Sequence, residues 1–226
     1  MGLSFIVEQK KIVKTMEIQH QDLSYEIYKQ LKIKILANEF KAGSKLKQEQ
    51  IAASFGVSRM PLYRAFQMLE NEMLIESIPR RGYFITKVDP SRLIDAFECR
   101  EALEGIAARR AAKNITGDQL EYMKSLFEKF IGEKEIKVSE YLESDQEFHN
   151  MIIKISGNQI LNRLEILGNN TIQTFRVGLL RPPNETLSEH LGILDAFEKG
   201  DGELAEKLSR EHTRIGTNIL INKYKK

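Results

Sequence analysis

Cysteine is nearly absent from this 226-residue chain, and the single residue present, Cys99, excludes any intrachain disulfide. Sparse cysteine is typical of proteins in a reducing cytosol, and we expect Cys99 to be a small buried apolar residue. Long apolar runs are also missing, because no stretch approaches the roughly 20 residues that a membrane-spanning helix requires. The sequence therefore predicts no transmembrane segment and no membrane partner.

Signals for export and lipid attachment are missing from the first residues as well. The opening MGLSFIVEQKK places its charges after a short apolar stretch, which reverses the order found in a secretory signal. Ile6 occupies the position where a myristoylation motif has serine or threonine. We therefore expect a cytoplasmic protein.

Charge is distributed unevenly, although the net charge of the chain is only +2. Residues 1–88 contain 14 lysines and arginines against 9 aspartates and glutamates, whereas residues 89–226 contain 20 against 23. The composition, 42% hydrophobic and 29% charged, suits one or two domains with buried cores. The cationic excess of the first part indicates that it faces a polyanion and that the second part has another role.

Hydrophobic periodicity in the first part predicts three helices. Residues 21–38 contain a stripe of four apolar side chains spaced four apart, namely Leu23, Ile27, Leu31 and Ile35. Residues 48–55 form a short second helix, and Gly56 supplies the turn that follows it. Ser58 is the expected N-cap of a third helix over residues 59–72.

A β-hairpin follows these helices. The segments LIESI and YFITKV read as two strands joined by PRRG, and Asp89-Pro90 predicts a linker near residues 88–92. We therefore expect a winged helix-turn-helix domain over residues 1–88 and a second domain over residues 92–226. The second domain reads as about six helices, separated by breaks at 114–117, 132, 157–158, 181–184 and 200–202. The predicted fold class is mainly α, with an all-α antiparallel helical bundle after the wing.

A helix, a glycine turn and a second helix that opens with Ser-Arg place the second helix in the major groove of DNA. Arg59 is then positioned to read a guanine through two hydrogen bonds. The hairpin tip offers two cations and a glycine for close approach to a phosphate backbone or a minor groove. The predicted DNA-binding residues are Arg59, Met60, Tyr63, Arg64, Lys47, Arg80, Arg81 and Gly82.

The competing interpretation is that these cations form a solvated face and that the helix-turn-helix merely packs a small domain. In both interpretations four apolar side chains of the third helix belong to the core, namely Leu62, Phe66, Leu69 and Met73.

The stretch GVSRMPLYRAFQMLENEMLI followed by PRRGYFI resembles the winged helix of GntR-family bacterial regulators. The resemblance covers about 65 residues and implies binding to double-stranded operator DNA. Family members generally use three arginines against DNA, and only Arg59 remains here, because Glu49 and Tyr63 occupy the other two positions. Met60 also replaces a small hydroxyl residue, while Arg64, Lys45 and Lys47 can supply phosphate contacts. We expect a changed operator sequence, with weakened affinity as the alternative.

Three histidines of the second part fall on apolar stripes of three different helices. The stripes are Leu142, Asp145, Phe148, His149 and Ile152; then Leu187, His190, Leu194 and Phe197; and then Leu204, Leu208, His212, Ile215 and Ile219. A carboxylate that faces a core is costly unless it is paired or coordinated. Convergence of the carboxylate and the three imidazoles would create a metal site. The alternative is a set of histidines that are packed separately.

The second part of the chain contains four short motifs, namely D-x-x-F-H at 145–149, S-G-N at 156–158, E-H-x-x-I-L-x-A at 189–196 and E-H at 211–212. Together they resemble the FCD effector domain of FadR-type GntR regulators. The domain is short, which makes it more similar to the VanR-like subgroup. The resemblance implies that Asp145, His149, His190 and His212 bind a divalent metal. Zinc suits these ligands best, and nickel or another late first-row ion is also compatible.

The same resemblance implies a small organic-acid effector at open metal positions and a homodimer that reads a palindromic operator. Arg100 matches an arginine near the family's ligand, although a helix-surface salt bridge with Glu104 explains it equally well. Arg176 is a weaker candidate that can equally be a surface residue.

Three functions remain open on this basis. The first is a regulator, most simply a repressor, whose operator affinity changes when a small acid binds at the metal. The second keeps DNA binding but makes the metal structural, which gives a constitutive or metal-sensing regulator. The third is a metal-dependent enzyme, which the sequence disfavours because no H-E-x-x-H helix or other evident general base accompanies the ligands. We therefore predict no catalytic residues.

Overall fold

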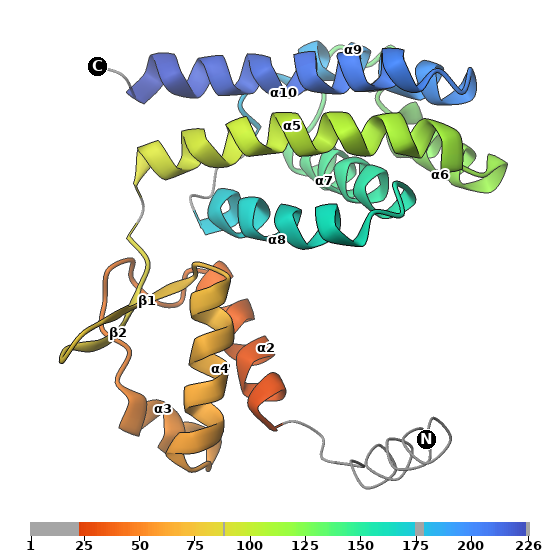
Figure 1. Cartoon of the computed structure of the whole chain (residues 1–226). Helices are drawn as coiled ribbons and strands as arrows, with labels where there is room; N and C mark the ends of the chain where they lie inside the picture. The colour runs from red at the N-terminus through yellow and green to blue at the C-terminus, as the bar shows by residue number, and fades with distance from the viewer. Residues whose placement is uncertain (1–22, 88, 175–178, 225–226) are drawn as a thin grey trace, which may run out of the picture.

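The computed structural model describes residues 23–87, 89–174 and 179–224, and these residues form two layers of structure (Figure 1). The amino-terminal part contains α2 (Leu23–Leu36), α3 (Gln48–Phe55), α4 (Arg59–Asn71) and a hairpin of β1 (Ile75–Ile78) and β2 (Gly82–Ile85). The carboxy-terminal part contains α5 (Pro90–Asn114), α6 (Gly117–Glu128), α7 (Val138–Ile155), α8 (Gln159–Thr174), α9 (Pro183–Glu198) and α10 (Gly202–Tyr224). The predicted mainly α fold class is confirmed.

The amino-terminal part has its own hydrophobic core. Apolar faces of α2 and α4 pack together with the hairpin, and the fully buried side chains include Ile27, Leu31, Leu62, Phe66, Leu69, Ile75 and Ile85. Ile75 pairs with Ile85 in the antiparallel ladder, and the chain reverses at Arg80 and Gly82, both of which have positive φ angles. This core fixes α4 and the wing relative to each other.

Two expectations about buried residues are wrong. Met73 is 49% exposed instead of lying in the core, because α4 ends at Asn71 and Met73 takes a left-handed backbone conformation with φ 57°. Helical spacing therefore stops predicting the direction of its side chain. Cys99 is exposed on α5 instead of buried.

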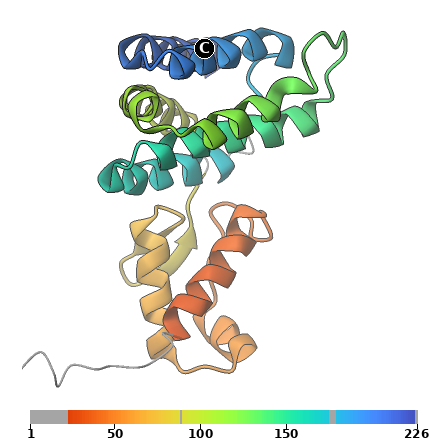
Figure 2. The same cartoon turned by 90° about the vertical axis from the view of Figure 1, so that its right-hand side faces the viewer.

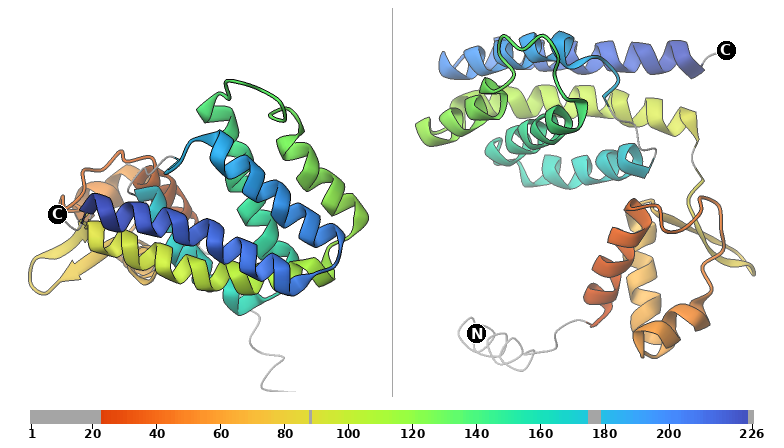
Figure 3. Two further views of the ribbon diagram at one scale, coloured as in Figure 1. Left: turned by 90° about the horizontal axis from the view of Figure 1, so that it is seen from above. Right: turned by 180° about the vertical axis from the view of Figure 1, so that it is seen from behind.

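The carboxy-terminal helices pack closely because α5 and α10 meet through small side chains. Buried alanines line α5, and the buried face of α10 consists mainly of Ala205, Ser209, Thr213, Gly216 and Thr217. A Cβ atom at Gly202 would lie 2.8 Å from the carbonyl oxygen of Arg109, so only glycine permits this approach. The two helices lie side by side along most of their lengths (Figure 3). The expected apolar stripe of α10 is thus partly wrong, since Ile215 is 41% exposed.

The two parts meet at α8, which faces the amino-terminal helices (Figure 2). Glu72, at the end of α4, accepts hydrogen bonds from Asn170 of α8 at 3.1 Å and from Tyr28 of α2 at 2.5 Å. Lys32 forms an ion pair with the same carboxylate at 2.7 Å. The predicted division of the chain near residues 88–92 stays a prediction. None of the described helices is long and apolar enough to span a membrane.

Candidate metal centre and nucleic-acid interface

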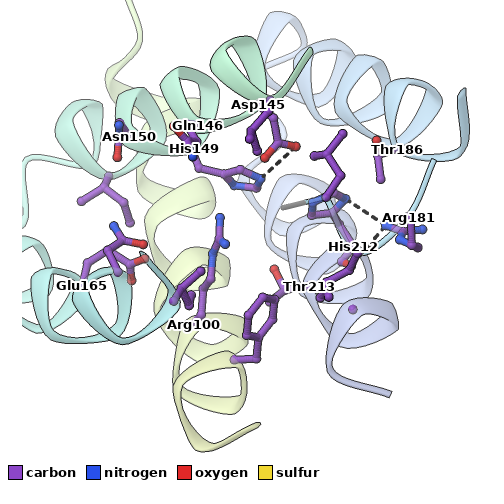
Figure 4. A pocket seen from close by; sticks show the side chains of 18 residues that line it. Arg100, Asp145, Gln146, His149, Asn150, Glu165, Arg181, Thr186, His212 and Thr213 are labelled. Atoms are coloured by element: carbon purple, nitrogen blue, oxygen red, sulfur yellow. Dashed lines mark hydrogen bonds and ion pairs between the residues drawn. The ribbon is translucent and has the colours of Figure 1, made fainter. Parts of the chain in front are cut away.

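Four side chains that the sequence singles out come together inside the helical part. Asp145 and His149 lie on α7, His190 on α9 and His212 on α10, and one ligand atom from each lies within 4.8 Å of the others. Asp145, His149 and His212 are labelled in Figure 4. On α7 the spacing of four residues directs Asp145 and His149 toward the same side. The predicted convergence is therefore present, whereas occupancy by a metal stays a prediction.

A polar group lies beside the Nδ1 atom of each histidine. His190 Nδ1 is hydrogen-bonded to the Tyr141 hydroxyl at 3.0 Å, and His212 Nδ1 lies 2.7 Å from Glu189 Oε2. His149 Nδ1 lies 3.1 Å from Glu104 Oε1, although the two atoms are not aligned for a hydrogen bond. Such outer groups orient the rings of metal-binding histidines and leave Nε2 as the donor atom.

The Nε2 nitrogen of His190, an atom that can bind a metal, is buried without a hydrogen-bond partner among the described residues. The His190 ring is completely buried, and the carboxylate nearest to Nε2 is Asp145 Oδ1 at 3.5 Å. Burial, with the positive charges of His212 and His149 as further causes, lowers the pKa of His190 well below its usual value. The ring is therefore neutral at pH 7, and because Nδ1 is hydrogen-bonded to Tyr141, Nε2 is the ring nitrogen that faces Asp145 of the cluster.

Three nitrogen atoms and one carboxylate oxygen form a donor set that fits zinc or another late first-row divalent ion. Burial also lowers the pKa of His212, although its hydrogen bond to Glu189 acts in the opposite direction. A buried nitrogen without a hydrogen bond is energetically unfavourable unless another partner takes its lone pair. A divalent ion between the four side chains would supply that partner.

Glu104 is a buried carboxylate next to the cluster, with 1% of its surface exposed. Arg100 Nε donates to its Oε1 at 2.6 Å, and the Thr213 hydroxyl donates to its Oε2 at 3.1 Å. Burial alone would raise the pKa of Glu104, but the charges of Arg100 and His149 outweigh it and lower the pKa. The predicted Arg100–Glu104 ion pair is present, but it lies inside the protein instead of on the helix surface.

A second ion pair sits on the other side of the cluster. Arg181 binds both carboxylate oxygens of Glu189. The same guanidinium lies against His212 (Figure 4). Burial raises the pKa of Glu189, whereas hydrogen bonds from Arg181 and His212 lower it, with a net value of about 2. Both residues were missed by sequence reasoning because Arg181 falls in a break between helices and Glu189 lies one residue off the apolar stripe of α9.

A cavity of about 130 Å³ opens beside the cluster, and its lining includes Asp145, His149, His212 and the Arg100 side chain that reaches in from α5 (Figure 4). Glu165 of α8 also lines this cavity, although sequence reasoning did not select it. Burial, followed by the charge of Glu104, raises the pKa of Glu165 to about 7. Its spacing of four from buried Leu161 was the available signal. Arg176 lies outside the described residues.

The predicted DNA-binding residues lie on exposed parts of α3, α4 and the hairpin. Arg59 and Met60 open α4 at the end of the molecule far from the helical bundle (Figure 1), and Tyr63 follows one turn later. Arg59 forms an ion pair with Glu49 of α3 at 2.7 Å, and the two side chains are 75% and 81% exposed. Exposed pairs of this kind contribute at most about 1 kcal/mol to stability. The pair therefore leaves Arg59 available for another partner.

The remaining candidates surround this helix end. Lys47, Arg64, Arg80 and Arg81 are all exposed, and the Arg81 guanidinium lies over the Phe84 ring at 5.4 Å. Gly82 has φ 94°, a conformation that side chains rarely adopt. The wing tip therefore combines two exposed cations with a backbone turn that would permit close approach to DNA. Contact with DNA stays a prediction for each residue.

Two family comparisons match this chain. Residues 23–85 match the family described as bacterial regulatory proteins, gntR family, and residues 95–214 match the FCD domain. The HTH-type transcriptional repressor RspR of Escherichia coli K12 is 28% identical over 85% of this chain and 86% of its own length. An uncharacterized HTH-type transcriptional regulator of Streptomyces ambofaciens is 30% identical over 84% of this chain and 81% of its own. Among solved structures, E. coli McbR/YncC superposes with a TM-score of 0.66 at 21% identity, covering 89% of this chain and 98% of its own, which supports the fold.

Proposed function

The chain belongs to the gntR family of bacterial regulatory proteins and carries an FCD domain, and from this premise we propose that it is a repressor controlled by a metal-bound small organic acid. Its relatives are transcriptional regulators and not enzymes. One observation carries the proposal: a carboxylate and three imidazoles converge beside a cavity, and a completely buried imidazole nitrogen among them has no hydrogen-bond partner in the part of the chain that the structure describes. Asp145, His149, His190 and His212 would hold the ion.

The cavity beside the cluster supports a small acidic effector. A divalent ion would attract a carboxylate by its charge, and the buried Arg100 guanidinium provides a second cation in the same cavity. The volume of about 130 Å³ suits a compact acid and excludes a bulky one. The protein groups thus bind and orient the acid, while the ion supplies the dominant positive charge.

Helix α8 provides a physical route from this cavity to the DNA-binding part. Glu165 faces the cavity, and Asn170 on the same helix donates to Glu72 at the end of α4. An acid that displaces Glu165 would shift α8 and thereby the carboxylate that holds Tyr28 and Lys32. A coupling of about 1–3 kcal/mol is enough for a 5- to 150-fold change in DNA affinity.

The acid response has a direct test. Zinc-loaded full-length protein is titrated onto DNA fragments from its own genomic neighbourhood, with and without a panel of small carboxylic acids that includes citrate and succinate. We expect at least one acid to weaken binding by about 5- to 150-fold, and only while the metal is present. If no acid has an effect but EDTA changes DNA affinity, the protein is a metal sensor with a structural site, which is the favoured alternative because four protein ligands can close a tetrahedral site.

The DNA-binding half is tested by Arg59→Ala. If Arg59 reads a guanine through two hydrogen bonds, the variant loses about 1–3 kcal/mol of discrimination at one base position. Binding of selected random-sequence DNA should show relaxed preference at that position, with little change in salt dependence. Arg80→Ala is the matched control, because loss of a phosphate contact weakens all sequences alike and lowers the salt slope by about one. Equal behaviour of the two variants would contradict base reading by Arg59.

A further inference from the structure

A second, larger cavity lies at the junction of the two parts of the molecule. Its volume is about 570 Å³, and none of the four clustered ligands lines it. One wall comes from the amino-terminal part, namely Met73, Thr86 and Lys87. The other walls come from α5 and α8, so a molecule in this cavity would touch both parts at once.

The lining of the junction cavity is mainly apolar. Leu103 of α5 and Leu164 and Leu167 of α8 line it, and small residues at Ala96 and Ala102 leave the space open. Cavities of roughly 300–1,000 Å³ with such linings are the usual size and chemistry of small-molecule sites. The lining therefore favours an occupant with an apolar body.

The charged groups at this cavity favour an anionic end on that occupant. Lys87 and Arg92 are exposed cations, and within the described ranges no carboxylate lies within 4.0 Å of either one. Two carboxylates line the same cavity, Asp95 at the opening and the buried Glu165 of α8, while Arg100 on the inner side is already paired with Glu104. At the opening itself Lys87 and Arg92 outnumber Asp95, which gives the opening a net positive character.

The backbone at this junction is strained. Met73 is not glycine, yet it has φ 57°, a conformation that costs about 1–3 kcal/mol and recurs at ligand clamps and switch regions. Its half-exposed side chain lines the cavity, and the preceding residue, Glu72, holds Asn170 across the junction. An occupant would therefore contact the segment that connects α4 to the helical part.

We propose that the junction cavity is a second ligand site, which binds an amphipathic organic acid with its apolar body between α5 and α8 and its carboxylate near Lys87 and Arg92. This ligand class differs from the compact acid proposed for the metal centre, because the cavity there is smaller and polar groups form a larger share of its lining than in the junction cavity. The two proposals use different binding groups, since the junction cavity contains none of the metal ligands and the two cavities share only Arg100 and Glu165 in their linings.

Cys99 makes the proposal testable, because it is exposed, lines the junction cavity and is the chain's single cysteine. The rate of its reaction with a thiol reagent is measured in full-length protein while decanoate, an unbranched fatty acid anion, is added below its micellar range. We expect saturable protection of Cys99, unchanged by EDTA or by added zinc. Lys87→Gln should raise the half-protecting concentration by up to about fivefold, the loss typical of an exposed ion pair.

Matched variants separate occupancy of the cavity from other effects. Ala102→Phe places a ring in the cavity and should abolish protection, whereas Ala53→Phe introduces the same ring on an exposed face of α3 and should leave it intact. The proposal is overturned if decanoate gives no protection, or protects Ala102→Phe as well as the parent protein. Protection that requires zinc would assign the acid to the metal centre. Protection that instead grows with protein concentration, without decanoate, would show that a second copy covers the cavity.

Discussion

Zinc added to metal-free protein is expected to raise the melting temperature by about 8–16 °C. A ligand at 1,000 times its dissociation constant stabilises the folded state by about 4 kcal/mol, and each kcal/mol shifts the midpoint of a chain of this size by roughly 2–4 °C. The increment arises because His190 Nε2, which has no hydrogen-bond partner among the described residues, would gain the ion as a partner, with the neighbouring Asp145 carboxylate as a further ligand. Differential scanning calorimetry with and without zinc measures it.

The rise in melting temperature on adding zinc, and not the melting temperature itself, identifies the metal site. His190→Ala also removes a ring that packs against Phe127 and Phe148, so the variant is less stable even without metal. Asp145→Asn alters the donor set with little change in volume, and Asp118→Asn is its matched control on the exposed start of α6. An increment retained in both His190→Ala and Asp145→Asn would exclude this cluster as the metal site.

Glu104→Ala is expected to destabilise the protein by about 3–5 kcal/mol. The reason is that Arg100 would remain as a buried cation without a partner, and breaking a buried ion pair in this way costs about that much. The Thr213 hydroxyl and the His149 ring lose a neighbour in the same step. Chemical denaturation of the metal-free protein measures the loss without the contribution of an ion.

Two controls make this prediction specific. Glu101→Ala removes a glutamate–arginine ion pair of the same chemistry from the same helix α5, because Glu101 of α5 binds Arg214 of α10 at 3.0 Å. That pair is largely exposed on the arginine side, so its loss should cost no more than about 1 kcal/mol. Glu104→Gln, which keeps an acceptor but not the charge, should fall between the two. Similar losses of stability for Glu104→Ala and Glu101→Ala would show that burial does not raise the cost of breaking the Arg100–Glu104 ion pair.

Periodicity predicted most of the architecture and placed the four clustered side chains on inward faces, while the resemblance to the FCD domain implied that they form one site. Histidines that recur with apolar residues at helical spacing must face the interior, and three such helices in one bundle bring them close. The same logic failed at Met73, where the helix had already ended, and on α10, where small residues and not large ones form the buried face. A sequence stripe of bulky residues does not reveal that two helices will approach through glycine and alanine.

The sequence did not predict the polar residues that surround the four clustered side chains. Tyr141, Arg181 and Glu189 acquire their roles from contacts between separate helices and loops, which no local spacing encodes. Glu165 shows the same difficulty, because its burial depends on how α8 lies against α5 and α7. Local pattern thus identifies candidate ligands, whereas tertiary packing decides which polar groups hold them in place.

The contact between Arg59 and Glu49 has a consequence for how the protein searches a genome. If Arg59 turns toward a base, it gives up this carboxylate neighbour, so each such contact would carry a small penalty. A guanine offers two hydrogen bonds in return, whereas a base without that pair of acceptors does not repay the loss. At a wrong site Arg59 would therefore stay with Glu49, so the pair would reserve the arginine contact for operators in a genome where wrong sites vastly outnumber them.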